Sequence, residues 1–110
     1  MATKSGAIVN FMTTGKIKVA KHIQPLAVCS VNCDVTANGV LKGLGGRATF
    51  ADSQSFVAGQ TFGLRITVKG QLLKLMKSNP GKFKLVETYT ATDPTTGAMD
   101  TISRAFKFKR

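Results

Sequence analysis

Apolar and polar residues alternate with a period of two along most of this 110-residue chain. In the segment 16–19, for example, Ile17 and Val19 alternate with Lys16 and Lys18. A period of two points successive side chains to opposite faces, which is typical of half-buried β-strands. The pattern therefore predicts a strand over 16–19 and over four further segments, namely 27–35, 63–69, 82–89 and 102–110.

The segment 71–78 breaks this pattern, because its apolar residues do not alternate with its two lysines. It predicts one or two turns of helix that end before Pro80, with an irregular strand as the alternative. Turns rich in glycine and proline separate the predicted strands. We therefore expect an arm over residues 1–15 and a single all-β domain over residues 16–110, either a mostly antiparallel barrel or a sandwich.

The charge of the chain is far from balanced. It carries 16 Lys and Arg residues but only 5 Asp and Glu residues, so its formal net charge is +11. Such a surplus is typical of proteins with an anionic partner, most often nucleic acid, and otherwise an anionic membrane or an acidic protein. No segment has the length of a transmembrane helix, so we expect no membrane partner. Because the N-terminus lacks a signal-peptide core and two cysteines fit a reducing compartment, we expect a cytoplasmic protein, in the host cytoplasm if a phage encodes it.

The basic residues of the predicted strands share one parity. Their neighbours along each strand are apolar and are expected to face the core, so the basic side chains should face outward. A basic surface built from several strands matches the phosphate backbone of a nucleic acid. The residues concerned are Lys16, Lys18, Arg65, Lys69, Lys82, Lys84, Lys107 and Lys109.

Binding of single strands also requires aromatic rings on which unpaired bases can stack. The segment 39–63 predicts a hairpin that turns at glycines and carries Lys42, Arg47 and Phe50, and Phe56 and Phe62 follow it. Phenylalanine is more often a core residue than an exposed one. Phe50 is the best candidate for an exposed ring, since it follows the glycine-rich tip and precedes a polar stretch.

The sequence offers no constellation for catalysis or for a metal. Cys29 and Cys33 would share one face of a continuous strand about 13 Å apart, too far for a disulfide, and we expect both in the core. A zinc site would need His22 and an acid as further ligands, in a spacing that zinc sites rarely use. With one histidine and no clustered carboxylates, we expect neither an enzyme nor a bound cofactor, metal or small-molecule substrate.

Four stretches of the chain, taken in order, resemble the single-stranded-DNA-binding protein of filamentous bacteriophages. KIKVAK is similar to the opening strand of that family, and TANGVLKGLGGRATF is similar to its DNA-binding hairpin. SFVAGQTFGLRITVKGQ and PGKFKLVETYTATDPTTGAMDTISRAFKFK resemble its central stretch and its closing hairpin. The chain departs from the family in its N-terminal arm, in a longer stretch before the hairpin, and in the segment LLKLMKS.

The resemblance implies a five-stranded, OB-like antiparallel barrel with a protruding β-hairpin, and a homodimer. It implies that Lys42 and Arg47 contact phosphates from the hairpin. It places Phe50, Phe56 and Phe62 where the family has tyrosines, some of which stack on bases. It also matches Arg104 to a basic residue of the last strand that contacts DNA.

We therefore expect a non-catalytic protein that coats single-stranded DNA during phage or plasmid replication. The alternative is an immunoglobulin-like structural protein of a virion or tail, because the segment 80–109 also resembles the last hairpin of bacterial immunoglobulin-like domains. Its lysines would then meet an acidic capsid or cell surface. A third possibility is binding to structured RNA. The position of the aromatic rings separates the first two: a DNA coat should expose Phe50 or a neighbour beside lysines, whereas a sandwich should bury nearly all rings.

Overall fold

The computed structural model describes residues 8–68 and 70–110 of the chain. Strands dominate this part, which confirms the prediction of an all-β protein. The strands are β1 (Val9–Phe11), β2 (Ile17–Lys18), β3 (His22–Ile23), β4 (Ala27–Cys29), β5 (Cys33–Gly43), β6 (Gly46–Phe56), β7 (Thr61–Phe62), β8 (Ile66–Thr67), β9 (Phe83–Thr92) and β10 (Met99–Lys109). The helices are α1 (Gln71–Ser78) and the short 3-10 helix η1 (Pro80–Lys82).

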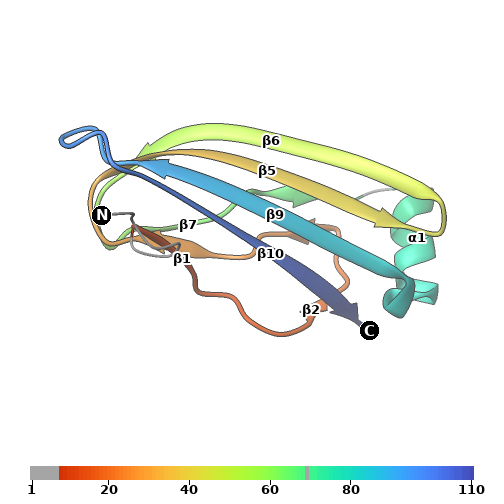
Figure 1. Cartoon of the computed structure of the whole chain (residues 1–110). Coiled ribbons are helices and arrows are strands. Elements are labelled where there is room, and N and C mark those ends of the chain that lie inside the picture. Colours follow the sequence, from red (N-terminus) through yellow and green to blue (C-terminus); the bar gives the residue numbers. More distant parts are fainter. Residues whose placement is uncertain (1–7, 69) are drawn as a thin grey trace.

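Five strands form one large sheet in the order β2-β10-β9-β5-β6 (Figure 1). Its four long strands are antiparallel neighbours, and β5 pairs with β9 from Asp34 to Gly43. The short β2 runs parallel to the end of β10, with Ile17 opposite Phe108. The large sheet is therefore mixed, with β2 and β6 as its two edges.

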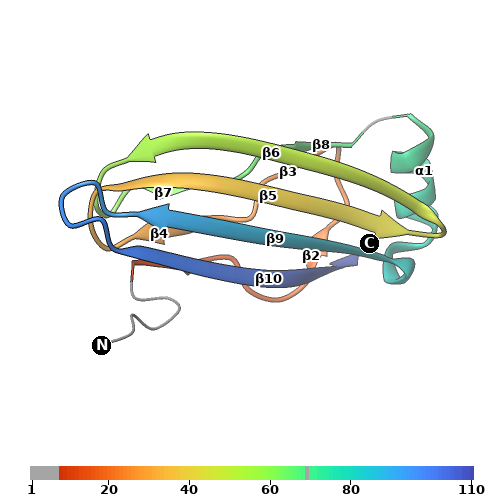
Figure 2. The ribbon, with the colours of Figure 1, turned by 45° about the horizontal axis from the view of Figure 1, so that its top comes forward.

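The other strands form a second layer below the large sheet. β1, β4 and β7 make a three-stranded antiparallel sheet, and β3 pairs with β8 (Figures 1 and 2). Apolar side chains from both layers fill the space between them, among them Val9 and Ile66 from the second layer and Leu85 and Phe106 from the large sheet. The molecule is elongated, with principal dimensions of 46 × 23 × 21 Å.

The alternation in the sequence correctly predicts which side chains form the core. In β9, Phe83 and Leu85 are buried and Lys84 is exposed, and in β10 Phe106 and Phe108 are buried on either side of the exposed Lys107. Every second side chain of these strands is buried against the second layer, which removes its apolar area from water. This burial stabilises the fold by about 25 cal/mol per Å² of apolar area. This burial is what fixes the outward direction of the lysines.

The five-stranded antiparallel barrel with a protruding hairpin is not confirmed. The hairpin of β5 and β6 does form, and its turn uses positive φ angles at Leu44 (49°) and Gly45 (77°), as tight hairpin turns require. It does not stand away from the body, however, because β9 pairs with β5 along nearly its whole length. The parallel β2 also makes the large sheet mixed rather than antiparallel.

The segment 71–78 is a helix, as the sequence predicts, and it ends before Pro80. It lies at the end of the molecule where β5 turns into β6 (Figure 2). Met76 is its buried residue and anchors it to the core. Residues 1–7 of the predicted arm lie outside the described residues, whereas residues 9–11 form β1, which pairs with β4 inside the second layer.

The prediction of one continuous strand over 27–35 is wrong. The chain turns between Cys29, at the end of β4, and Cys33, at the start of β5. The two Cα atoms are therefore 6.5 Å apart rather than the distance of an extended strand, and the cysteines form a disulfide. Both are buried, as expected, but the expectation that they cannot bridge each other is corrected by this turn.

Candidate anion-binding face

Four basic residues stand directly opposite one another on the outer face of the large sheet. Lys107 of β10 faces Lys84 of β9, Lys84 faces Lys42 of β5, and Lys42 faces Arg47 of β6. All four are exposed, and partners that are directly opposite in a sheet point to the same face. We call Lys107, Lys84, Lys42 and Arg47 the basic row. With about 4.8 Å between strands, it spans roughly 14 Å across the sheet.

Further basic residues extend this row. Lys109, also on the outer face of β10, lies opposite Lys18 of β2. A Cβ atom at Gly43 would overlap the carbonyl oxygen of Lys82 on the inner side of the sheet, so Lys82 lies at the same end of the molecule as the row. Five strands and η1 thus bring together seven of the predicted site residues at one end of the molecule.

The five acidic residues of the chain lie elsewhere. Glu87 and Asp100 are buried in the core, and Asp52 lies on the inner side of β6. Asp34 is on the outer face but starts β5, eight residues from Lys42, which is about 26 Å along a strand. Asp93 is in the turn after β9 at that same far end. No acidic side chain of the protein therefore neutralises the basic row.

The rest of the outer face is apolar next to the row and then rich in hydroxyl groups. One row further along the strands, Ala105, Val86, Val40 and Thr49 stand opposite one another. The next two rows carry hydroxyl groups, and two of their cross-strand pairs are hydrogen bonded. Thr88 Oγ1 and Ser103 Oγ are 3.0 Å apart, and Thr90 Oγ1 and Thr101 Oγ1 are 3.2 Å apart.

The three phenylalanines predicted to meet DNA bases do not lie on this face. Phe50 stands opposite Gly39 on the inner side of β6 and is half-buried against the core, so it is not the exposed ring that the sequence suggested. Phe56 and Phe62 stack on each other, with ring centroids 4.2 Å apart and planes 10° apart. None of the seven phenylalanines, nor the single tyrosine, is exposed, and all eight are among the described residues.

The remaining predicted site residues lie outside the row, two of them next to Lys107 and one in the second layer. Arg104 has the inward parity of β10, opposite the buried Glu87, although its side chain is exposed. It lines a shallow hollow with Lys16 and with Lys107 from the row. Arg65 precedes β8 in the second layer, on the far side of the core from the row. Lys69 lies outside the described residues.

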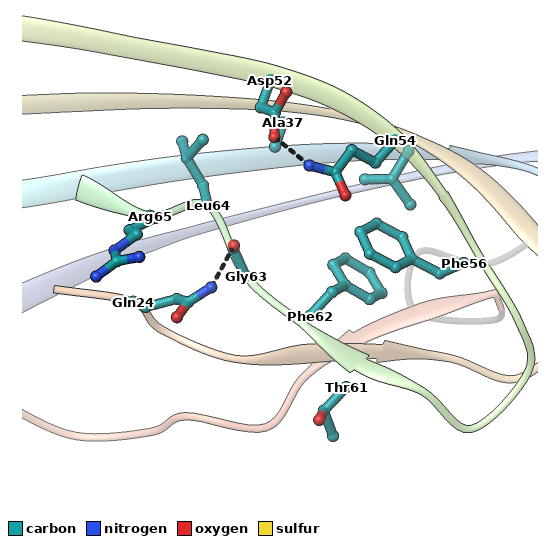
Figure 3. A pocket seen from close by; sticks show the side chains of 11 residues that line it. Gln24, Ala37, Asp52, Gln54, Phe56, Thr61, Phe62, Gly63, Leu64 and Arg65 are labelled. Atoms are coloured by element: carbon teal, nitrogen blue, oxygen red, sulfur yellow. Dashed lines mark hydrogen bonds between the residues drawn. The ribbon is translucent and has the colours of Figure 1, made fainter.

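A cavity of about 340 Å³ opens between the inner side of β6 and the segment 63–65 that leads into β8 (Figure 3). Its polar groups already bind one another: Gln54 Nε2 donates to Asp52 Oδ2 at 2.8 Å, and Gln24 Nε2 donates to the carbonyl of Gly63 at 2.9 Å. The stacked Phe56 and Phe62 line its other side. Among the residues that line the cavity, Asp52 supplies the one carboxylate and none is a histidine, cysteine or lysine, so the lining offers no acid–base pair.

A buried carboxyl group in the core was missed by the sequence analysis. Burial raises the pKa of Glu87 to about 7, although a hydrogen bond that Tyr89 Oη donates to Glu87 Oε1 at 2.9 Å opposes this rise. Its other oxygen, Oε2, has no hydrogen-bond partner. Burial also raises the pKa of Tyr89, whose oxygen accepts the backbone N–H of Leu64. Glu87 alternates in phase with Leu85 and Tyr89 along the strand, so the sequence pattern already placed its side chain toward the core.

Comparison with known proteins identifies no relative: no family model, no curated protein and no solved structure matches the chain. Residues 8–68 and 70–110 contain no group of three or more His, Cys, Asp and Glu side chains that could hold a metal ion. Within the same residues, no helix has the length and apolar character needed to cross a membrane.

Proposed function

We propose that the chain is a non-catalytic structural and attachment module with an immunoglobulin-like sandwich fold, and that it presents the basic row to an acidic partner. The observation that carries this proposal is the position of the aromatic rings. All eight rings are half-buried or buried, and none lies on the outer face beside the lysines. A face of cations without rings can attract an anionic surface but gives unpaired bases nothing to stack on.

The arrangement of strands supports the same proposal. The sheet order β10-β9-β5-β6 corresponds to strands G, F, C and C′ of an immunoglobulin-like domain. β1, β4 and β7 then correspond to strands A, B and E of the opposite sheet. The disulfide between Cys29 and Cys33 supports a protein that works in an oxidising compartment, because disulfides are rare where thiols are kept reduced.

Coating of single-stranded DNA is the second candidate function, and the basic row is the observation that favours it. A track of cations across several strands could follow a phosphate backbone. On this proposal the protein is a cytoplasmic homodimer related to the filamentous-phage proteins and folds as an OB-like barrel. It would then have to bind bases without an exposed ring, or rearrange β6 to expose Phe50.

Binding to oligo-dT and to the matching duplex, measured by fluorescence anisotropy at low and moderate salt, separates the two candidates. We expect weak and equal affinities for both nucleic acids, which fall steeply with salt, and no change in Phe50→Leu. Leucine keeps the inward position filled but cannot stack on a base. Tighter binding to the single strand, with a loss of about tenfold in a folded Phe50→Leu variant, would establish the DNA coat instead.

A further inference from the structure

We propose that the outer face of the large sheet binds a linear anionic polysaccharide, one that carries carboxylate or sulfate groups and lies across the strands along the basic row. This inference rests on the proposed function, since it names the chemistry of the acidic partner. Two features of the face argue for it: the line of charges and the apolar strip beside that line. The absence of exposed rings argues against unpaired bases as the partner.

The charges are arranged for an extended polymer rather than for a small anion. A small anion site gathers its donors around one point, whereas Lys107, Lys84, Lys42 and Arg47 lie in line, one to each strand. The step between them is the strand spacing of about 4.8 Å, which is close to the length of one sugar residue. Like charges directly opposite one another destabilise a sheet, so a bound polyanion would remove a repulsion that the protein itself leaves in place.

The row beside the charges suits sugar rings. Val40 and Val86 form an apolar strip next to the basic row, against which the C–H faces of sugars can pack. Thr88 and Thr90 lie about 13 and 20 Å along β9 from Lys84, at the strand rise of about 3.3 Å per residue, so a polymer that follows the row does not reach their hydroxyl groups.

The compartment also favours a polysaccharide over a nucleic acid. The disulfide of Cys29 and Cys33 indicates an oxidising environment, such as a cell surface. Anionic polymers at cell surfaces are built largely of sugars. Together with the absence of an exposed ring, this makes the carbohydrate the partner that the observations favour.

The test is the affinity of the whole chain for four labelled oligomers of equal length: a heparin fragment for sulfate, an oligogalacturonate for carboxylate, a neutral dextran, and oligo-dT. Lys42→Gln with Lys84→Gln removes the centre of the row. Lys21→Gln with Arg65→Gln removes the same charge at two exposed sites in the second layer, away from the row. We expect one or both anionic sugars to bind more tightly than oligo-dT, and the row variant to lose about tenfold or more, while the control loses less than about twofold.

A second variant tests the sugar-specific part of the face. Val40→Thr with Val86→Thr keeps shape and charge but makes the apolar strip polar, and thermal unfolding verifies that it is folded. We expect it to weaken the anionic sugar at moderate salt and to leave oligo-dT unchanged. If oligo-dT is bound more tightly than both anionic sugars through the row, the polysaccharide is wrong although the row remains a binding site. If the row and control variants lose affinity equally for every anionic oligomer, the row is not a site, and the proposed function fails with it.

Discussion

At the scale of single residues, the most unusual group is Glu87. It is fully buried, its Oε2 has no hydrogen-bond partner, and the one hydrogen bond of its carboxyl group comes from Tyr89. Arg104 stands opposite it in the register, but the exposed guanidinium does not pair with it. An ionised carboxylate in this position would be costly, and this cost is why burial raises the pKa of Glu87 to about 7.

The raised pKa of Glu87 predicts how stability depends on pH. In the unfolded chain the carboxyl ionises near its ordinary pKa of 4.5, whereas in the folded protein it stays protonated up to about 7. The folded state therefore keeps a proton that the unfolded chain loses. The free energy of unfolding is highest below pH 4.5 and falls as the pH rises to about 7. We expect the free energy of unfolding of Glu87→Gln, measured with urea, to lack this decline of a few kcal/mol.

Asp34→Asn is the control for this experiment, because Asp34 is an exposed carboxylate on the outer face. It should keep the decline of the unmodified protein between pH 4.5 and 7. A Glu87→Gln variant with the same decline as Asp34→Asn would show that Glu87 is ionised throughout that range, and that the pH dependence has another origin.

At the scale of elements, the alternation of residues predicted the faces of the strands but not their partners. Parity alone placed Lys84 outward and Leu85 inward, because it follows from the geometry of a single strand. Parity alone could not predict the basic row, because the register of Lys42 against Lys84 depends on the pairing of β5 with β9. These two lysines are more than forty residues apart in the sequence. The parallel β2 likewise depends on a crossing between layers, for which the sequence carries no local signal.

The turn between β4 and β5 shows where the alternation misled. Cys29, Val31 and Cys33 alternate as in a continuous strand, so the pattern did not reveal the turn at residues 30–32. The turn lacks glycine and proline, which are the usual signals. Arg65 was grouped with the site by parity, which does not tell which layer a residue joins. Phe50 was chosen because it follows the glycine-rich tip, and Arg104 was included on the resemblance alone.

The disulfide gives a prediction at this scale. It closes a short loop between β4 and β5, and a loop of about five residues corresponds to roughly 2 kcal/mol of stabilisation in the chain-entropy description. We expect the double variant Cys29→Ser, Cys33→Ser to lose about this much free energy of unfolding, and the unmodified protein to lose a similar amount when reduced. Reduction of the double variant is the control. If the stability of the unmodified protein does not change on reduction, and its mass shows two free thiols, the argument for an oxidising compartment is removed.

At the scale of the whole molecule, positive charge gathers at one end, and the few acids lie in the core, in the cavity beside β6, or at the other end. The basic row, Lys82, Lys109 and the lysines of α1 share the end near the turn between β5 and β6 (Figure 2). A net charge of +11 destabilises the folded state through self-repulsion, and this end bears most of it. Such an arrangement is expected of a surface retained for binding rather than for stability.

This conflict between stability and binding can be measured at Lys84, which lies between Lys42 and Lys107. In Lys84→Glu two repulsive cross-strand pairs become two attractive ones, so we expect the midpoint of thermal unfolding to rise by a few degrees at low salt. The gain should shrink as added salt screens the charges over about 10 Å at 0.1 M. The same variant should lose its affinity for anionic oligomers. Lys21→Glu, outside the row, should change neither property appreciably. If Lys84→Glu instead lowers the midpoint while Lys21→Glu does not, the lysines of the row do not repel one another, and their alignment gives no reason to expect an anionic partner.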